Sequence, residues 1–137
     1  MANTSRRKFI SNSGKMAVGA GLLTFDTNKK QMDAENIFVH HVYFYLNNPN
    51  SKEDLNELLN GLKGMKKIKN YKLVHIGKPA DTNRPVIEKS YAISWLCIFE
   101  SKEEQEKYQV DPIHLDFIEK CKHLWSKVVV YDSVDLA

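Results

Sequence analysis

The stretch from Ile37 to Leu46 consists of Ile, Val, Phe, Tyr, Leu and His, without a single Lys, Arg, Asp or Glu. β-branched and aromatic residues favour strands, and a strand without a polar face is typical of one that is buried on both sides. Side chains alternate between the faces, so His40 falls on one face and His41 on the other, together with Tyr43 and Tyr45. The pattern predicts a central strand with one histidine on each face.

A leucine stripe follows this strand and predicts an amphipathic helix. Ser51 to Asp54 approximates a capping box, and the helix should end near Lys69–Asn70. Apolar residues recur at helical spacing along it: Leu55, Leu58, Leu59, Leu62 and Met65. A stripe of this kind is most often part of a core.

The rest of the chain predicts three more strands and a short helix. Strands are expected over residues 71–77, 91–99 and 128–131, and residues 78–87 form an irregular loop with two prolines. Ser101 is a suitable cap for the short helix that follows the third strand. Both faces of the strand over residues 91–99 are apolar, so both are expected to be buried.

A break in a helical pattern marks the segment from Tyr108 to Trp125. Asp111 is suited to cap a new helix, with Pro112 at its first position. His114 then falls in the first turn, on the face that also carries Phe117 and Cys121. Burial and the positive end of the helix dipole both disfavour a charged imidazole, so we expect a neutral ring that accepts a proton.

The predicted order is strand, helix, strand, strand, helix, strand. This order is typical of the α+β ferredoxin-like sandwich, in which helices cover one face of a four-stranded antiparallel sheet. The uncovered face would be apolar, so we expect a homodimer in which two sheets pack face to face and close an α/β barrel. The residues expected to line this interface are Phe38, Val42, Phe44, Leu96 and Ile98.

Composition and charge narrow the function classes. The 137 residues suffice for one domain with a core. The net charge of +3 comes from residues 1–30, because the rest of the chain carries 14 Lys and Arg against 16 Asp and Glu. A nucleic-acid-binding surface is therefore not expected, and no apolar run reaches the length of a membrane span. Cys97 and Cys121 lack metal-ligand spacing, and whether they pair stays open.

The basic N-terminus has the layout of an export signal. Ser5 to Ile10, with the pair Arg6–Arg7, is followed by a small-residue apolar stretch from Met16 to Phe25. This segment resembles the twin-arginine signal of prokaryotes, which implies an exported, periplasmic protein. We therefore expect a signal and linker over residues 1–34 and one domain over residues 35–137. The alternative interpretation is a disordered basic tail.

Three stretches together resemble the stress-responsive dimeric α/β-barrel (Dabb) family from about Asn36 to Val134. They are His41 in the first strand, the segment from Tyr108 to Phe117, and the segment from Trp125 to Asp132. The resemblance implies the dimeric ferredoxin-like fold. A plant member of the family is a polyketide cyclase that works without metal or cofactor, and its catalytic pair would fall on His114 and Tyr108. This chain has Asp111 where that enzyme has a further histidine.

These residues suggest a candidate site with an apolar small molecule as its ligand. A neutral histidine could remove a proton beside a carbonyl group while a tyrosine hydroxyl holds the developing enolate, so His114 is the expected base and Tyr108 the expected donor. No metal or cofactor is expected. The predicted ligand-binding side chains are His41, Tyr43, Tyr45, Leu59, Leu62, Trp95 and Phe117.

Three functions remain open at this point. The first is a cofactor-free lyase or cyclase that acts on a small carbonyl compound. The second is a binding module that holds an apolar molecule without chemistry. The third is a cofactor-free monooxygenase, since related dimeric α/β barrels oxidise planar substrates. The sequence alone does not name the ligand.

Overall fold

The computed structural model describes residues 33–136. It contains a four-stranded antiparallel sheet and, within the described residues, three α-helices. The elements are β1 (Phe38–Leu46), α2 (Lys52–Met65), β2 (Leu73–Gly77), β3 (Ile93–Phe99), α3 (Lys102–Gln109), α4 (Pro112–Cys121), a 3-10 turn (Lys122–Leu124) and β4 (Trp125–Val134). The predicted export signal, with Arg6–Arg7 and residues 16–25, lies outside the described residues.

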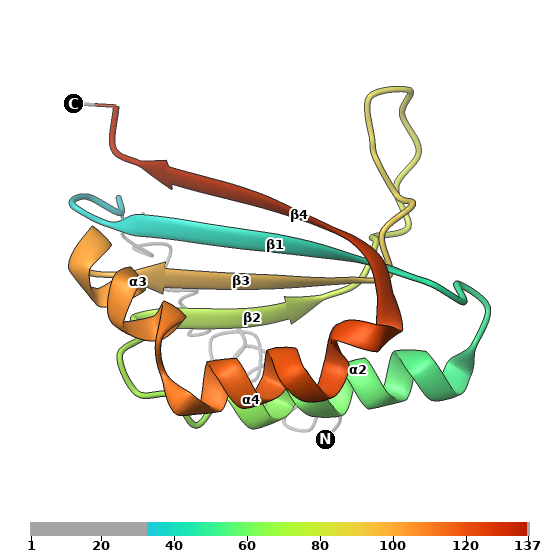
Figure 1. The fold of residues 1–137 in the computed structure, drawn as a ribbon. Helices are drawn as coiled ribbons and strands as arrows, with labels where there is room; N and C mark the ends of the chain where they lie inside the picture. Colours follow the sequence, from blue (N-terminus) through green and yellow to red (C-terminus); the bar gives the residue numbers. More distant parts are fainter. Residues whose placement is uncertain (1–32, 137) are drawn as a thin grey trace, which may run out of the picture. The chain divides into compact units, whose positions relative to one another are not determined.

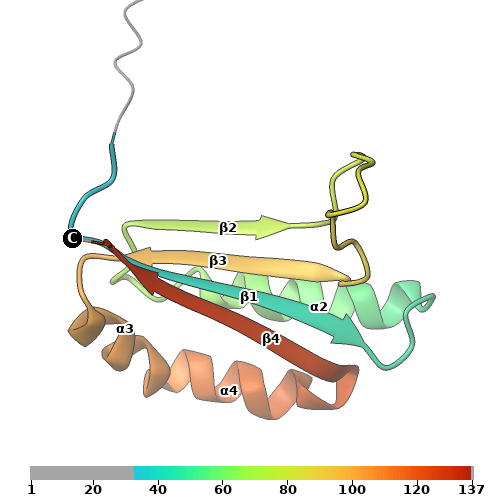
Figure 2. The same ribbon diagram turned by 90° about the horizontal axis from the view of Figure 1, so that it is seen from above.

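The strand order in the sheet is β2-β3-β1-β4, as Figure 2 shows directly. β1 lies in the middle because it pairs along its length with both β3 and β4. Helices α2 and α4 lie together on one side of the sheet and leave the other side open (Figure 1). The predicted ferredoxin-like α+β fold is confirmed.

Helix α2 and strand β4 differ most from their predicted bounds, and β2 and β3 each begin two residues later than predicted. Helix α2 ends at Met65 instead of near Lys69, because tighter hydrogen bonds three residues apart close the chain into a turn, from Lys66 N to Lys63 O and from Ile68 N to Met65 O. Strand β4 begins at Trp125 and runs to Val134, well beyond the predicted residues 128–131. Polar residues at both ends of β4 interrupt the apolar pattern from which the strand was predicted. Nine residue pairs with β1 nevertheless define the longer strand.

The core lies between the sheet and the helices. The side chains buried there include Val42 and Phe44 of β1, Trp95 and Phe99 of β3, and Leu58 and Leu62 of α2. The packing between α2 and α4 is close at Gly61, where an added Cβ would lie 2.7 Å from Cys121 Sγ and 3.0 Å from the Phe117 ring. Cys97 and Cys121 are both buried and unpaired.

The structure corrects the predicted interface residues. Phe38, Val42 and Phe44 belong to the helix-covered face and are buried within the chain. Leu96 and Ile98 do lie on the open face, with Val39, His41 and Tyr43 of β1 as their cross-strand neighbours or partners. Both faces of β1 are apolar, so alternation alone did not identify the face that the helices cover.

The connection between β2 and β3 projects from the sheet on the side away from α2 and α4 (Figure 1). It contains the turn around Ala80 and Thr82, and Val86 is almost fully exposed in it. Among the helices that the structure describes, none combines the length and the hydropathy that crossing a membrane requires.

Candidate functional site

The break between α3 and α4 brings Tyr108 and His114 together. Asp111 caps α4 by accepting a hydrogen bond from the Ile113 amide at 2.8 Å, and Pro112 occupies the first helical position. This cap ends α3 at Gln109 and turns the chain sharply. As a result, the Tyr108 and His114 rings lie with their centroids 4.4 Å apart, which is the convergence that the sequence predicts.

The orientation of the His114 ring is set by the backbone. Its Nδ1 lies 3.1 Å from the carbonyl oxygen of Gln109. A carbonyl oxygen only accepts, so Nδ1 must carry the hydrogen, and the neutral ring keeps a free lone pair on Nε2. Burial lowers the pKa of His114, and the hydrogen bond to Gln109 only partly opposes this shift. His114 therefore has the protonation state of a base at neutral pH.

The Tyr108 side chain is almost fully buried, with 1% of its surface exposed. Burial raises the pKa of its hydroxyl far above the ordinary value, and the neighbouring Cys97 and Tyr71 add to the shift. The phenol therefore keeps its proton over the physiological range. It can donate a hydrogen bond, but it is not a base.

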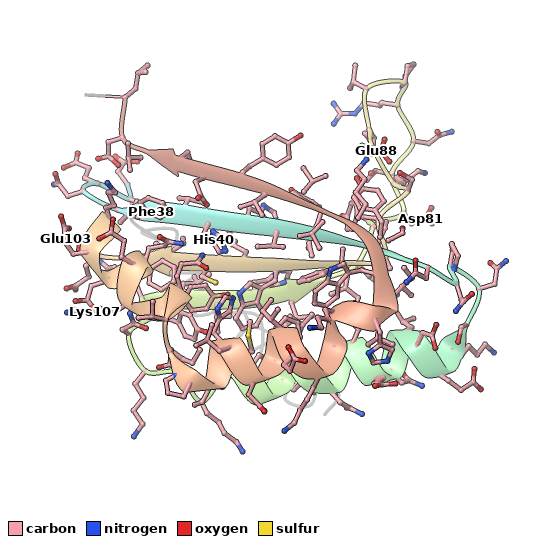
Figure 3. The ribbon with its side chains drawn as sticks, in the orientation of Figure 1. Phe38, His40, Asp81, Glu88, Glu103 and Lys107 are labelled. Atoms are coloured by element: carbon pink, nitrogen blue, oxygen red, sulfur yellow. The ribbon has the colours of Figure 1, made fainter. Side chains whose placement is uncertain are left out.

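A third ring, His40, faces the same space and was not among the predicted site residues. Its Nδ1 lies 2.6 Å from Asp132 Oδ1, its cross-strand partner on β4. Its ring centroid lies 5.6 Å from that of Tyr108. Figure 3 shows His40 on the side of β1 that faces the helices. The signal in the sequence was an aspartate on the last strand that could register with a histidine of the first, but strand register cannot be read from one sequence.

These three rings line a cavity of about 180 Å³ between the sheet and helices α3 and α4. Of the predicted ligand-binding residues, Trp95 and Phe117 also line it. Leu62 is fully buried in the core and does not reach the cavity, and Leu59 lines a different hollow beside Ile76. The remaining wall is apolar except for Gln109, with Val42, Phe44, Met65, Ile118, Trp125, Val128 and Val130.

His41, Tyr43 and Tyr45 do not form the floor of this cavity, as the sequence had suggested. They lie on the open face of the sheet, because His40 and not His41 shares the buried face with Val42. The Tyr43 hydroxyl lies 3.0 Å from His41 Nδ1. Tyr43 and Tyr45 line a separate, larger hollow of about 500 Å³ with Glu88, Tyr91, Lys127, Val129 and Tyr131.

Metal ligands are not grouped in the described part of the chain, where no three His, Cys, Asp or Glu side chains come together in a way that could hold an ion. The chemistry that the cavity offers comes from two imidazoles and a phenol. Together they can accept a proton and donate a hydrogen bond.

Comparison with solved structures confirms the fold. A Dabb family protein with a ferredoxin-like fold from Mesorhizobium loti is 18% identical, with a TM-score of 0.62 over 74% of this chain and 98% of its own. A dimeric protein of unknown function from Bacteroides fragilis is 16% identical, with a TM-score of 0.58 over 74% and 98%. The hydroxynitrile lyase of Passiflora edulis is 17% identical, with a TM-score of 0.60 over 74% and 95%.

Sequence comparisons identify the family of this chain but no individual curated relative. A search of curated proteins finds no significant match. The model of the stress-responsive A/B barrel domain, Dabb, matches residues 38–135, which include every strand and helix that the structure describes. The chain is a member of the stress-responsive A/B barrel domain (Dabb) family.

Proposed function

We propose that this Dabb protein is a cofactor-free lyase or cyclase that transfers a proton on a small carbonyl compound held in the cavity. The observation that carries the proposal is the hydrogen bond from His114 Nδ1 to the Gln109 carbonyl, which leaves Nε2 as a free base beside the Tyr108 phenol. The fold is compatible with such chemistry, since the similar Passiflora edulis protein is a hydroxynitrile lyase.

The proposed reaction assigns one role to each ring. His114 Nε2 removes a proton from the carbon beside the carbonyl group. The electron pair of the broken C–H bond forms a C=C bond, and the π pair of the carbonyl group moves onto its oxygen. The Tyr108 hydroxyl donates a hydrogen bond to this oxygen and stabilises its negative charge. The enolate carbon then attacks a second carbonyl carbon, whose oxygen takes the proton back from His114 as the new C–C bond forms, or the enolate carbon itself takes this proton back. Tyr108 keeps its own proton throughout, in accord with its raised pKa.

The cavity contributes by excluding water from the reacting atoms. Its lining beyond the two imidazoles and the phenol is predominantly apolar. In such a setting, the hydrogen bond from a buried phenol to an oxyanion is stronger than in water. A binding protein without chemistry would have no need of a free base at this point, which is why we favour a lyase over a binding module.

Identification of the natural ligand tests the proposal. The full chain is purified natively, and small molecules that come with it are released and identified by mass spectrometry. The ligand is then incubated with the wild type, with His114→Ala and with His123→Ala, which changes an exposed histidine that does not line the cavity. We expect conversion by the wild type and His123→Ala only. Unchanged turnover by His114→Ala would exclude His114 as the base, and a ligand that is never converted would indicate a binding module.

We further propose that the open sheet face forms a homodimer interface. The face carries a contiguous set of apolar and aromatic side chains, among them Val39, Tyr43, Leu96, Ile98 and Tyr131. An apolar surface of this kind is rarely left exposed on a soluble monomer. The Bacteroides fragilis protein of the same fold is dimeric.

Light scattering coupled to size-exclusion chromatography tests this interface at micromolar concentration. We expect a dimeric mass for the wild type. Leu96→Asp should yield a monomer, because it places a carboxylate in the middle of the open face, whereas Leu115→Asp changes an exposed residue on α4 and should stay dimeric. A monomeric wild type would contradict the proposal.

The localisation is also a proposal, which rests on residues 5–25 alone. We propose export by the twin-arginine route into the periplasm. Fractionation of cells that produce the full chain tests it, with Arg6→Lys/Arg7→Lys as the variant and Lys29→Arg/Lys30→Arg as the control. Retention of the first variant in the cytoplasm is expected. Equal distribution of both variants would contradict a twin-arginine signal.

A further inference from the structure

Among residues 33–136, no charged side chain lines the cavity between the sheet and helices α3 and α4. The hydrogen-bonding side chains that line it are His40, Trp95, Tyr108, Gln109 and His114, and these residues include no Lys, Arg, Asp or Glu in its wall. A carboxylate or phosphate taken from water into such a wall would lose its hydration without gaining a cation. The lining therefore disfavours anionic ligands.

His40 is held in the same tautomer as His114, by a different partner. Its Nδ1 lies 2.6 Å from a carboxylate oxygen of Asp132. An ionised carboxylate only accepts hydrogen bonds, so Nδ1 carries the hydrogen and the neutral ring has its lone pair on Nε2. The described part of the chain gives Nε2 of neither histidine a hydrogen-bond partner. Both histidines that line this small cavity therefore have an Nε2 atom that can accept a hydrogen bond from a ligand.

The two histidines flank Tyr108. The centroid of the Tyr108 ring lies 4.4 Å from the centroid of the His114 ring and 5.6 Å from that of the His40 ring. A ligand whose carbonyl group lies between His114 and the Tyr108 hydroxyl would therefore have His40 within reach of another part of the molecule. Only a hydroxyl or N–H group would satisfy the Nε2 lone pair of His40, because an ether or a carbonyl oxygen offers no hydrogen.

We propose that the cavity takes a small, neutral carbonyl compound that carries a hydroxyl group, with the hydroxyl donating to His40 Nε2 and Asp132 positioning the His40 ring. The inference rests on the proposed function, since it assigns the substrate class of the same site. The volume of about 180 Å³ is below the usual size of drug-binding pockets, so a single ring or a short chain is the appropriate size.

Three probes of matched shape test this assignment. The isotope-labelled full chain is titrated with 4-methylphenol, 4-methylanisole and 4-methylbenzoate while the amide NMR signals of residues 108–111 and 113–118 are followed. The phenol should bind at least about fivefold more tightly than the anisole, which is the effect of one neutral hydrogen bond. The benzoate should leave these signals unchanged. Equal affinity of phenol and anisole, or tighter binding of benzoate, would overturn the proposal.

Variants then assign the selectivity to His40. His40→Leu replaces the acceptor by an apolar side chain of similar size. It should bring the ratio of phenol to anisole affinity close to one. Asp132→Asn, which leaves the imidazole in place, should lower the same ratio and shift the His40 tautomer in ¹⁵N NMR spectra. His123→Leu is the exposed control and should keep the wild-type ratio. An unchanged ratio in both His40→Leu and Asp132→Asn would overturn the assignment.

The proposed lyase or cyclase activity and the proposed substrate class can be refuted independently of each other. Loss of probe selectivity with turnover that still depends on His114 would refute the substrate class and leave the lyase in place. Turnover that does not depend on His114, with phenol selectivity intact, would refute the lyase and leave the hydroxyl site.

Discussion

Asp132 and His40 form a hydrogen-bonded pair across β4 and β1, with Oδ1 and Nδ1 2.6 Å apart. His40 is buried, whereas the Asp132 side chain is half exposed. Asp132→Ala would leave a buried N–H without a partner, which costs about 1 to 3 kcal/mol in the free energy of unfolding. Asp132→Asn keeps an acceptor and should cost less. Urea denaturation measures both, and a stability of Asp132→Ala equal to the wild type would contradict the pairing.

Gly61 and Gly64 form a matched pair on α2. A Cβ at Gly61 would lie 2.7 Å from Cys121 Sγ, whereas a Cβ at Gly64 would meet no atom of residues 33–136 within 4 Å. Gly61→Ala should therefore force α2 and α4 apart and destabilise the fold by about 1 to 3 kcal/mol. Gly64→Ala should stabilise it by up to about 1 kcal/mol, through its better helix propensity. Opposite shifts of the urea midpoint are expected, and shifts of the same sign would contradict the close helix contact.

The Asp111 cap should matter more for the site than for the fold. Asp111→Ala removes the hydrogen bond to the Ile113 amide and should cost about 1 kcal/mol of stability. It should also disturb the hydrogen bond between His114 and Gln109, since the cap fixes the start of α4. Ser101→Ala removes the equivalent cap of α3 and serves as the control. The ¹⁵N chemical shifts of the His114 ring should change in Asp111→Ala only. The same change in Ser101→Ala would contradict the proposal that the Asp111 cap positions His114.

Stability should fall as the solution becomes more acidic than about pH 6.5. Burial lowers the pKa of both His41 and His114 below the ordinary value of 6.5. The unfolded chain therefore binds more protons than the folded chain in this range, and the free energy of unfolding decreases as the pH falls. The contribution of the two neutral histidines to the free energy of unfolding is therefore fully present only at higher pH.

Denaturation at pH 7.5 and pH 5.5 tests this sign. The loss of stability between the two pH values should be smaller in His114→Gln and in His41→Gln than in the wild type. His123→Gln changes an exposed histidine and should reproduce the wild-type loss. A larger loss in His114→Gln would contradict the lowered pKa.

The order of elements could be predicted from the sequence, because period and capping signals are local. The leucine stripe of α2, the Ser101 cap and the Asp111–Pro112 start of α4 each depend on residues within a few positions. The convergence of Tyr108 and His114 was also predictable, since one break in one segment produces it. The family resemblance agreed with this order.

The choice of sheet face could not be predicted in the same way. Both faces of β1 are apolar, so the alternation assigns His40 and His41 to opposite sides but does not say which side the helices cover. That choice depends on tertiary packing, here of Val42 and Phe44 against the helices. The pairing of His40 with Asp132 depends on the register of two strands more than ninety residues apart, which no local pattern encodes.

Proton exchange in D₂O tests most directly whether His114 acts as a base on a carbonyl compound. The probe is 4-hydroxyacetophenone, whose methyl protons exchange through its enolate and whose hydroxyl suits His40. Proton NMR should show faster loss of the methyl signal with the wild type than in buffer. His114→Gln should lower the enzymatic rate by about 100-fold or more, the usual contribution of a general base. Exchange by His114→Gln at the wild-type rate, or no acceleration by the wild type, would contradict the proposed function.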